Sequence, residues 1–233
     1  MSADPQLVSR ARGALLGLVA GNQLGVPTER LGTADAIRRS FPNGIKDLAP
    51  PPKNSPYDDD AAMALLLGES LLSNNGFDAA DVARRWVKWM KMDGRGIGLT
   101  TKHALTLIHR GKEPFEAGRL ANQENPNRSA GNGSVMRCLP VALRYHDEID
   151  RLIRVSTQQA AITHSDERCT WAAARELLHG NIYFIDEVLH RIGDRAPRAL
   201  REAIHRVPRE RERDLPIAIE GEAGYVIHCV EIA

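Results

Sequence analysis

The sequence has few aromatic residues, few cysteines and no long apolar run. Aromatic side chains make up only 5% of the 233 residues, while 42% of the residues are hydrophobic and 26% are charged. This balance, rich in Ala, Leu and charged side chains, favours packed helices over sheets. No run approaches the roughly 18 apolar residues that a membrane-spanning helix needs. We therefore predict an all-α protein, a compact bundle of several helices with no membrane partner.

Neither charge nor cysteine content indicates a nucleic-acid partner or a disulfide framework. The 31 basic and 30 acidic residues leave a formal charge of +1, so nucleic acid is not the expected partner. The three cysteines lie far apart without a CxxC motif, which indicates reduced, buried thiols. They are Cys138, Cys169 and Cys229. The apolar segment 13–21 resembles the apolar part of a signal peptide. The acidic Asp4, in what would be the basic region before it, argues against a signal peptide. We predict a cytoplasmic protein.

Three consecutive acids, Asp58, Asp59 and Asp60, stand between a proline-rich loop and the apolar run 63–67. Such a run reads as a buried helix, so the acids lie at its N-terminus. Carboxylate oxygens there could converge on a hard cation such as Mg²⁺ or Mn²⁺. Aspartate is also a preferred N-cap, and the helix dipole favours acids in the first turn. Both interpretations stay open at this point.

Glycines recur every fourth residue on an otherwise apolar, helical segment near the N-terminus. They are Gly13, Gly17, Gly21 and Gly25. This spacing places them on one face, where we expect another backbone to approach closely. The helix ends at Val26-Pro27, and Glu29 follows near whatever the glycines pack against. Taken alone, Glu29 is a surface residue.

A second informative stretch, 129–137, places small residues before an apolar helix expected at 135–143. Free N–H groups at such a helix start could bind an anion such as a diphosphate, although a turn with a serine N-cap explains the pattern equally well. A helix over 149–162 leads to His164, and Asp166 begins the next helix. Because His164 lies at this junction, it is better placed to touch a ligand than a core histidine would be.

Other patterns complete a predicted single domain spanning residues 1–233. A core helix should run from about Asp59 to Ser73, and Asp78 should cap the next helix. A further helix should run through His109 after the glycine-rich segment 93–98. Alternating charges over 186–213 predict a solvated face, and residues 222–233 predict an apolar helix. We find no internal repeat and no second domain boundary.

Taken in order, these motifs resemble the ADP-ribosylglycohydrolase family. The resemblance runs from about residue 11 to the last residue, and Gly-Asn-Gly-Ser-Val-Met-Arg is its most specific string. The segments that carry it are the glycine helix ending in Glu29, the acids from Tyr57 to Met63, Gly98 with Thr100-Thr101, the loop 131–137 and Thr163-His164.

The resemblance implies an all-α fold that holds two Mg²⁺ or Mn²⁺ ions and hydrolyses the bond joining ADP-ribose to a modified side chain. Its partner would be an ADP-ribosylated protein or an ADP-ribose-type small molecule. The implied metal ligands are Asp58, Asp59 and Asp60. The catalytic acids would be Glu29 and Asp59, although Asp60 could equally be the base. The implied substrate-binding residues are Gly131, Asn132, Gly133, Ser134, Met136 and His164.

The sequence also departs from the family pattern. Asp58 replaces a threonine ligand, and Gly96 replaces the acid of an Asp-Ile-Gly motif. The family's second set of metal ligands lies beyond Ala233, so we expect the C-terminal part of the fold, and half of the metal shell, to be missing. The rival hypotheses are a truncated member that binds ADP-ribose without hydrolysis and a helical structural protein. Assembly into an oligomer is left open.

Overall fold

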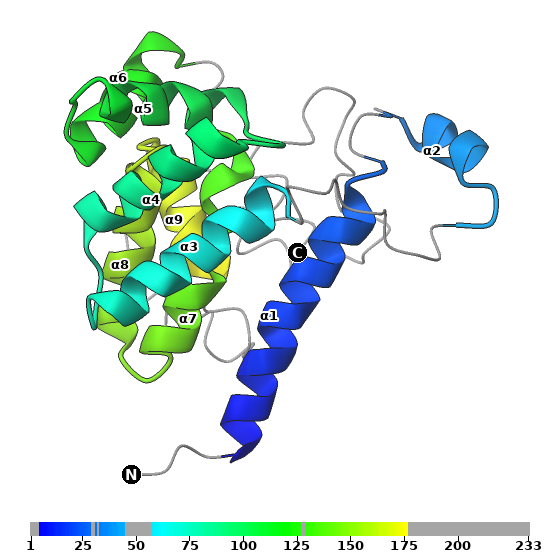
Figure 1. The fold of residues 1–233 in the computed structure, drawn as a ribbon, viewed down its shortest axis with the longest axis horizontal. Helices are drawn as coiled ribbons and strands as arrows, with labels where there is room; N and C mark the ends of the chain where they lie inside the picture. The colour runs from blue at the N-terminus through cyan, green and yellow to red at the C-terminus, as the bar shows by residue number, and fades with distance from the viewer. Residues whose placement is uncertain (1–4, 29–30, 32, 45–56, 127–128, 177–233) are drawn as a thin grey trace.

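A computed structural model of the chain describes residues 5–28, 31, 33–44, 57–126 and 129–176. Helices dominate these residues, as Figure 1 shows, which confirms the predicted all-α class. The helices are α1 (Pro5–Gly25), α2 (Ala34–Ser40), α3 (Asp59–Ser73), α4 (Ala79–Met92), α5 (Leu99–His109), α6 (Pro114–Glu124), the 3-10 turn η1 (Asn132–Ser134), α7 (Leu139–Tyr145), α8 (Ile149–Ala161) and α9 (Glu167–Glu176).

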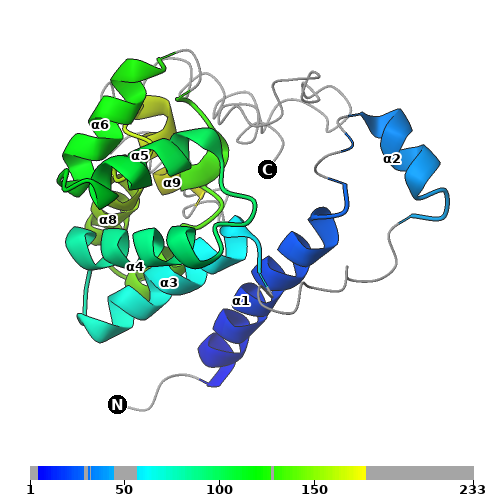
Figure 2. The ribbon, with the colours of Figure 1, turned by 45° about the horizontal axis from the view of Figure 1, so that its top comes forward.

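Helices α3 to α9 form a bundle, and α1 lies along one side of it. Within the bundle α3 packs against α4 and α7, while α8 packs against α7 and α9. Helix α5 contacts both α4 and α6. The two ribbon views agree that α2 stands apart from the bundle (Figures 1 and 2). Helix α3 therefore carries the acidic motif and also packs against α4 and α7 in the bundle.

Aspartate caps set the starts of α3 and α4, as the sequence predicts. Asp58 has extended backbone angles, and its carboxylate accepts a hydrogen bond from the N–H of Asp59 at 2.9 Å. Asp78 likewise accepts from the N–H groups of Ala80 and Asp81. Such caps satisfy amides that have no partner inside the helix. The expected end of α3 near Ser73 and the expected helix through His109 are also confirmed.

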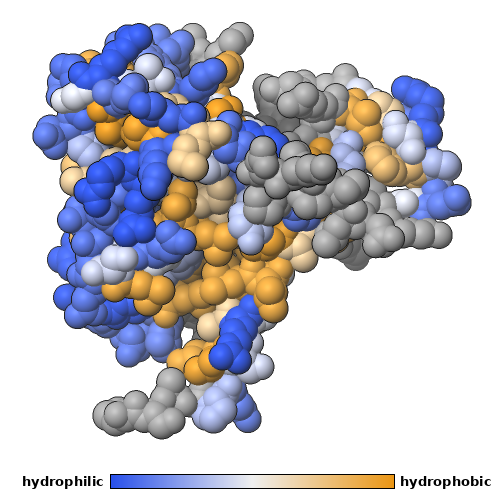
Figure 3. Space-filling view, in the orientation of Figure 1, coloured by the Kyte–Doolittle hydropathy of each residue, from blue (hydrophilic) through white to orange (hydrophobic). Residues whose placement is uncertain are grey.

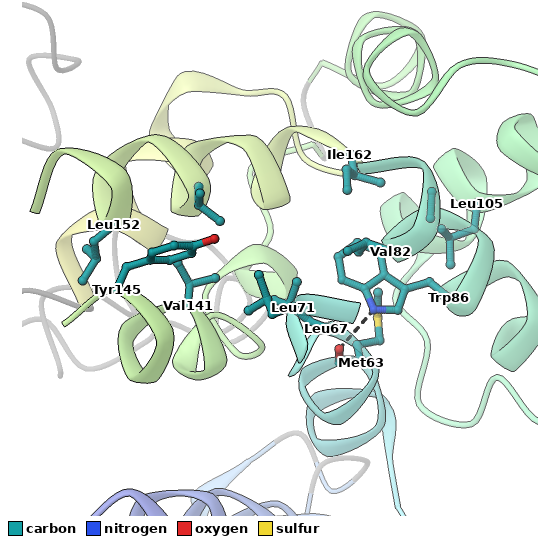
Figure 4. Packing of buried hydrophobic residues seen from close by; sticks show 12 residues of the cluster. Met63, Leu67, Leu71, Val82, Trp86, Leu105, Val141, Tyr145, Leu152 and Ile162 are labelled. Carbon is teal, nitrogen blue, oxygen red and sulfur yellow. Dashed lines mark hydrogen bonds between the residues drawn. The ribbon is translucent and has the colours of Figure 1, made fainter. Parts of the chain in front are cut away.

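One apolar core joins α3, α4, α5, α7 and α8. Trp86 is fully buried in it, and its indole N–H donates to the carbonyl of Met63 at 3.0 Å, the dashed line in Figure 4. Burying a large side chain of this kind contributes roughly 1.5–3 kcal/mol. The residues of this cluster are Met63, Leu67, Leu71, Val82, Ala83, Trp86, Leu105, Val141, Tyr145, Leu152, Val155 and Ile162. The core thus fixes α3 and the acids at its start.

The helix expected at 135–143 begins later than predicted. A 3-10 turn occupies Asn132–Ser134, and α7 starts only at Leu139. Pro140 explains the difference, because proline is tolerated in the first helical turn but its ring would clash with the carbonyl of Met136 in a continuous helix. The prediction of an α-helix immediately after Ser134 is therefore wrong.

The glycine face of α1 does not meet a neighbouring backbone within the described residues. At Gly13, Gly17, Gly21 and Gly25 no atom lies within 4 Å of the place a Cβ would occupy. Leu16, on the same helix, is 70% exposed. The space-filling view shows apolar surface over the region between α1 and the bundle (Figure 3). The close approach expected at these glycines is wrong for the part of the chain that the structure describes.

Several other predictions have mixed outcomes. Helix α6 was not predicted, although Pro114 in its first turn is a typical start signal. Cys138 and Cys169 are buried free thiols, as expected. No helix among the described residues is long and apolar enough to cross a membrane. Predictions that lie outside the described residues are those for Glu29, Cys229 and the segments 186–213 and 222–233.

Candidate functional site

The acidic end of the site is tied to α1 by Asn22. The side-chain amide of Asn22 donates to Asp60 Oδ2 at 2.8 Å, and its oxygen accepts from the backbone N–H of Asp58 at 3.3 Å. Asn22 itself is buried in spite of its polarity. The long α1 thus has a defined role, because its last turn presents an amide that orders the chain entering α3.

The glycine-rich loop 93–98 closes over these acids at Gly96. This glycine has a φ of +78°, and a Cβ there would collide with the carboxylate of Asp58 and lie 2.5 Å from Asp59 Oδ1. Only glycine can bring a backbone this close in that conformation. The family pattern has an acid at this position, whereas this chain places the bare backbone of Gly96 against the acids.

The three acids are not electrically equivalent. Burial, followed by repulsion from Asp58, raises the pKa of Asp60, and the hydrogen bond from Asn22 only partly offsets this shift. Asp58 and Asp59 are both buried, with exposed fractions of 2% and 9%. Neither Asp58 nor Asp60 has an arginine or lysine partner among the described residues. Asp58 and Asp60 therefore keep negative charges that repel one another, whereas Asp59 interacts electrostatically with the buried guanidinium of Arg137.

The fit of this cluster to a metal ion is incomplete. Among the described residues no three acidic, histidine or cysteine side chains are grouped so that they could hold a metal. One oxygen of Asp58 caps its own helix, and one of Asp60 accepts from Asn22. Mg²⁺ can be held by one or two carboxylates that leave several waters in place. The described residues therefore do not form a complete metal shell, and the predicted ligand role of Asp58, Asp59 and Asp60 stays a prediction.

The second end of the site is built where η1 meets the residues that follow α8. A Cβ at Gly133 would lie 2.7 Å from Cε1 and 3.2 Å from Nε2 of His164, and 3.2 Å from Oγ1 of Thr101. No side chain fits there without displacing the imidazole. The structure thus brings together Gly133 and His164, two of the predicted substrate-binding residues, and adds Thr101 from α5.

The other predicted substrate-binding residues are placed less uniformly. The hydroxyl of Ser134 donates to the carbonyl of Cys169 at 3.1 Å, so it holds η1 against α9. Met136 packs against the apolar core. Asn132 is exposed, and the carbonyl of Gly131 accepts from the thiol of Cys169 at 3.3 Å. Ser134 and Met136 therefore shape the turn and Gly133 is buried within it, whereas Asn132 is exposed.

Arg137 connects the two ends, and the sequence analysis missed its role. Its guanidinium is fully buried, lies 4.1 Å from the ring centroid of Trp86, and donates to Thr163 Oγ1 at 2.8 Å. Burial lowers the pKa of Arg137 to about 9, against the opposing influence of Cys138 and Asp59, so it remains a cation at neutral pH. The sequence signal for this role was an arginine directly before a buried apolar helix. A buried arginine is rarely found without a partner.

An open pocket of about 550 Å³ lies along α3 and α4 rather than at either end of the site. Tyr57 and Asp93 line its edge close to the acids. Most of its lining is apolar, including Leu65, Leu66 and Trp89. We assign the functional site to the acids and the Gly133–His164 contact, because specific polar chemistry needs convergent polar groups rather than an apolar surface.

The helical fold, the acidic start of α3 and the glycine turn closed on a histidine together define a class of protein. The chain belongs to the ADP-ribosylglycohydrolase family, whose model matches residues 3–233. This finding confirms the resemblance drawn from the motifs.

Individual relatives agree with this assignment. The chain is 34% identical over 172 residues to ADP-ribosylhydrolase ARH3 of Bos taurus, covering 68% of this chain and 45% of that protein. It is 31% identical over 216 residues to the ADP-ribosyl-[dinitrogen reductase] glycohydrolase of Rhodospirillum rubrum, covering 87% and 65%. A solved ADP-ribosylglycohydrolase-related protein complex matches with a TM-score of 0.65 and 28% identity, covering 95% and 72%. The chain thus spans 45% to 65% of the length of these two relatives.

Proposed function

We propose that this protein hydrolyses the glycosidic bond between ADP-ribose and a modified protein side chain. Family membership and the names of the relatives support this reaction class. One further relative, from Pseudomonas putida, is named an ADP-ribosylarginine hydrolase, which makes arginine one candidate for the modified side chain. The buried free thiols of Cys138 and Cys169 support a cytoplasmic location as part of the same proposal.

The observation that carries the proposal is the contact between Gly133 and His164. The family resemblance assigns both residues to the ligand, and the fold brings them together from segments that are distant in the sequence. A glycine that only formed a turn would not need an imidazole at 2.7 Å from the place of its missing Cβ. The proposed ligand lies over this turn, with its scissile bond toward the acids of α3.

The acids supply the base in this proposal. A carboxylate accepts a proton from water as the water oxygen bonds to the anomeric carbon, and the electrons of the glycosidic bond leave with the side-chain nitrogen or oxygen. A base works best when its pKa is close to the operating pH. The pKa of Asp60 is shifted in that direction by burial and by Asp58, which favours Asp60 beside Asp59 for this role. Glu29, outside the described residues, remains the other predicted acid.

Divalent metal is part of the proposal. When bound, Mg²⁺ or Mn²⁺ would orient ribose hydroxyls and lower the pKa of a coordinated water. The mutual repulsion of Asp58 and Asp60, which raises the pKa of Asp60, supports such a cation. The described residues offer fewer carboxylates than a complete two-metal site needs, so we derive no reaction step from the ion.

A second candidate function is binding of ADP-ribose, or a related nucleotide, without hydrolysis. The observation that favours it is the absence of a three-ligand group among the described residues. In this alternative the Gly133–His164 turn still holds the ligand, but the acids lack the ion that activates water. An oligomer in which a partner completes the site is compatible with either function.

Release of free ADP-ribose from ADP-ribosylated arginine and serine peptides tests the proposal. We expect release by the purified chain in the presence of Mg²⁺ or Mn²⁺, and loss of release on addition of a chelator. Calorimetry with ADP-ribose separates the alternatives, because binding without release identifies the second candidate. Absence of both binding and release, from protein shown to be folded by circular dichroism, would contradict both functions.

A further inference from the structure

Arg137 is a fully buried cation whose hydrogen-bond acceptors are all neutral, and the charge of Asp59 only partly offsets the cost of burying it. Its Nε donates to Gln159 Oε1 at 2.9 Å, and its Nη2 donates to the Gln159 carbonyl at 3.1 Å and to Thr163 Oγ1 at 2.8 Å. All these acceptors are neutral, and the described residues give it no ion pair. The ring of Trp86 supplies part of the compensation. An apolar side chain would fill this space at lower cost, so the position calls for another explanation.

A guanidinium dictates the direction of hydrogen bonds next to it, because it can donate but never accept. Thr163 Oγ1 must therefore accept from Arg137. The single hydroxyl proton of Thr163 then has one described acceptor, Nδ1 of His164 at 2.8 Å. If Nδ1 of His164 donated to Thr163 instead, the hydroxyl proton of the fully buried Thr163 would have no acceptor, which is unfavourable. Nδ1 of His164 is thus an acceptor.

The imidazole of His164 carries its one remaining proton on Nε2. Burial, and then the charge of Arg137, lowers the pKa of His164 to about 3, so the ring is neutral at pH 7. A neutral imidazole has one donor and one acceptor nitrogen. Since Nδ1 accepts from Thr163, Nε2 is the donor.

Nε2 faces the glycine turn and has no partner among the described residues. The edge of the ring that carries it lies against Gly133. The only buried side-chain nitrogen or oxygen atoms without a partner in the described part of the chain belong to Arg95. Nε2 of His164 therefore accounts for part of the 3% of this residue that remains accessible. A donor that reaches the surface beside a glycine turn is available to a ligand oxygen.

We propose that Arg137 is a positioning residue which, through the hydroxyl of Thr163, holds His164 as an Nε2–H donor to a phosphate or ribose oxygen of the ligand at Gly133. The identity of this ligand as ADP-ribose rests on the proposed function, whereas the relay from Arg137 to His164 rests only on the geometry. Arg137 does not touch the ligand in this arrangement. Its role is to fix which nitrogen of His164 carries the proton.

The test uses the full chain and three variants. Thr163→Val removes the relay hydroxyl, and Thr163→Ser restores it with a smaller side chain. Ser156→Ala is the matched control, because it deletes another buried hydroxyl, which donates to the Leu152 carbonyl at 2.6 Å away from the relay. Nitrogen-15 NMR of the imidazole, with the His164 signal assigned from a His164→Gln variant, reports which nitrogen is protonated. Calorimetry with ADP-ribose reports the dissociation constant.

We expect Nε2 of His164 to be protonated in the unmodified chain and in Thr163→Ser, and the hydrogen-bond shift of Nδ1 to disappear in Thr163→Val. We expect Thr163→Val to weaken ADP-ribose binding about tenfold, the equivalent of one well-formed hydrogen bond. Thr163→Ser and Ser156→Ala should stay within about twofold of the unmodified chain, whereas a purely structural role would affect Ser156→Ala and Thr163→Val alike.

Two results would overturn the proposal. Protonation on Nδ1 of His164 in the unmodified chain would disprove the relay whatever the ligand, and needs no variant to fold. Unchanged affinity in a folded Thr163→Val protein would disprove the role of the relay in binding. Failure of the unmodified chain to bind ADP-ribose would instead count against the proposed function, and so the two failures are distinguishable.

Discussion

Acidic side chains lie near both ends of α3, and their charges are compensated in different ways. At the C-terminal end, Asp81 of α4 accepts from Ser70 at 2.7 Å, from Asn74 at 2.9 Å and from Arg85 at 2.7 Å, and it also pairs with Arg84. At the N-terminal end, the described partners of Asp58 and Asp60 are neutral amides from Asn22 and the backbone.

The pKa values reflect this difference. Burial alone would raise the pKa of Asp81, but hydrogen bonds from Ser70, Arg85 and Asn74 lower it to about 2. For Asp60, which is only partly buried, desolvation and repulsion from Asp58 outweigh the hydrogen bond from Asn22, and the pKa is raised. An acid that is fully partnered, like Asp81, holds helices together, whereas acids that repel one another, like Asp58 and Asp60, are the ones for which we propose a chemical role. The comparison predicts opposite consequences when each group is altered.

The largest effect is expected for Asp81→Ala. This change leaves Ser70, Asn74 and Arg85 without their common acceptor at a site that is only 5% exposed. We expect the free energy of unfolding to fall by about 3 kcal/mol, measured by urea denaturation. Glu69→Ala is the matched control, because Glu69 binds the same Arg85 at 3.2 Å but is 60% exposed. A loss as large for Glu69→Ala as for Asp81→Ala would contradict the structural role of Asp81.

A smaller loss is expected when the space beside the other acids is filled by Gly96→Ala. The φ of +78° disfavours alanine, and the new methyl group would collide with the carboxylate of Asp58. We expect a loss of about 2 kcal/mol in the free energy of unfolding. Gly98→Ala is the control in the same loop, since its φ is −66° and nothing lies within 4 Å of the added Cβ. Equal stabilities of the two variants would show that Gly96 is not in close contact with the acids.

Much of this arrangement could be predicted from local sequence signals. The aspartate caps at 58 and 78 located the starts of α3 and α4, because capping depends on residues within one turn. The start of α7 was predicted too early, since the apolar periodicity from Val135 outweighed the local signal of Pro140. Helix α6 carries the start signal of Pro114 but only a weak apolar pattern, and it was missed.

The sequence could predict which residues belong to the candidate site, but not which of them contact one another. The string from Gly131 to Arg137 indicated a ligand turn, yet nothing local reveals that Gly133 lies against His164 or Gly96 against Asp58. These contacts depend on how α3, α5 and α8 pack. The role of Arg137 is equally non-local, because its acceptors, Gln159 and Thr163, follow it by more than 20 residues. Donors and acceptors in the relay can be assigned only when the positions of these partners in the fold are known.

Acid should weaken the Asp81 cluster within a defined pH range. Because the folded-state pKa of about 2 lies below the ordinary aspartate pKa of 3.8, the contribution of Asp81 is fully present above pH 4 and is lost as the pH falls from about 4 to about 2. We expect this loss to amount to about 1–2 kcal/mol. The measurement is the difference in unfolding free energy between the unmodified chain and Asp81→Asn at several pH values. A difference that does not shrink toward pH 2 would contradict the lowered pKa.

The smallest effect on stability, and the largest on function, is expected for Asp59→Asn combined with Asp60→Asn. Removing two like charges relieves the repulsion that raises the pKa of Asp60, and this offsets the lost attraction to the start of α3. We expect the unfolding free energy to change by less than about 1 kcal/mol. Release of ADP-ribose should be lost, because the acids proposed to accept the proton and to hold the cation become neutral.

Asp150→Asn controls for the helix contribution, since Asp150 also lies in the first turn of a helix, α8. It should leave ADP-ribose release unchanged, because it lies outside both ends of the site. A loss of several kcal/mol in the double variant would mean that these acids tie the fold together as Asp81 does. Unchanged release would exclude Asp59 and Asp60 from the chemistry and leave α3 with structural acids at both ends. Stability and activity measured on the same proteins therefore decide whether the two acid groups differ in function or only in their partners.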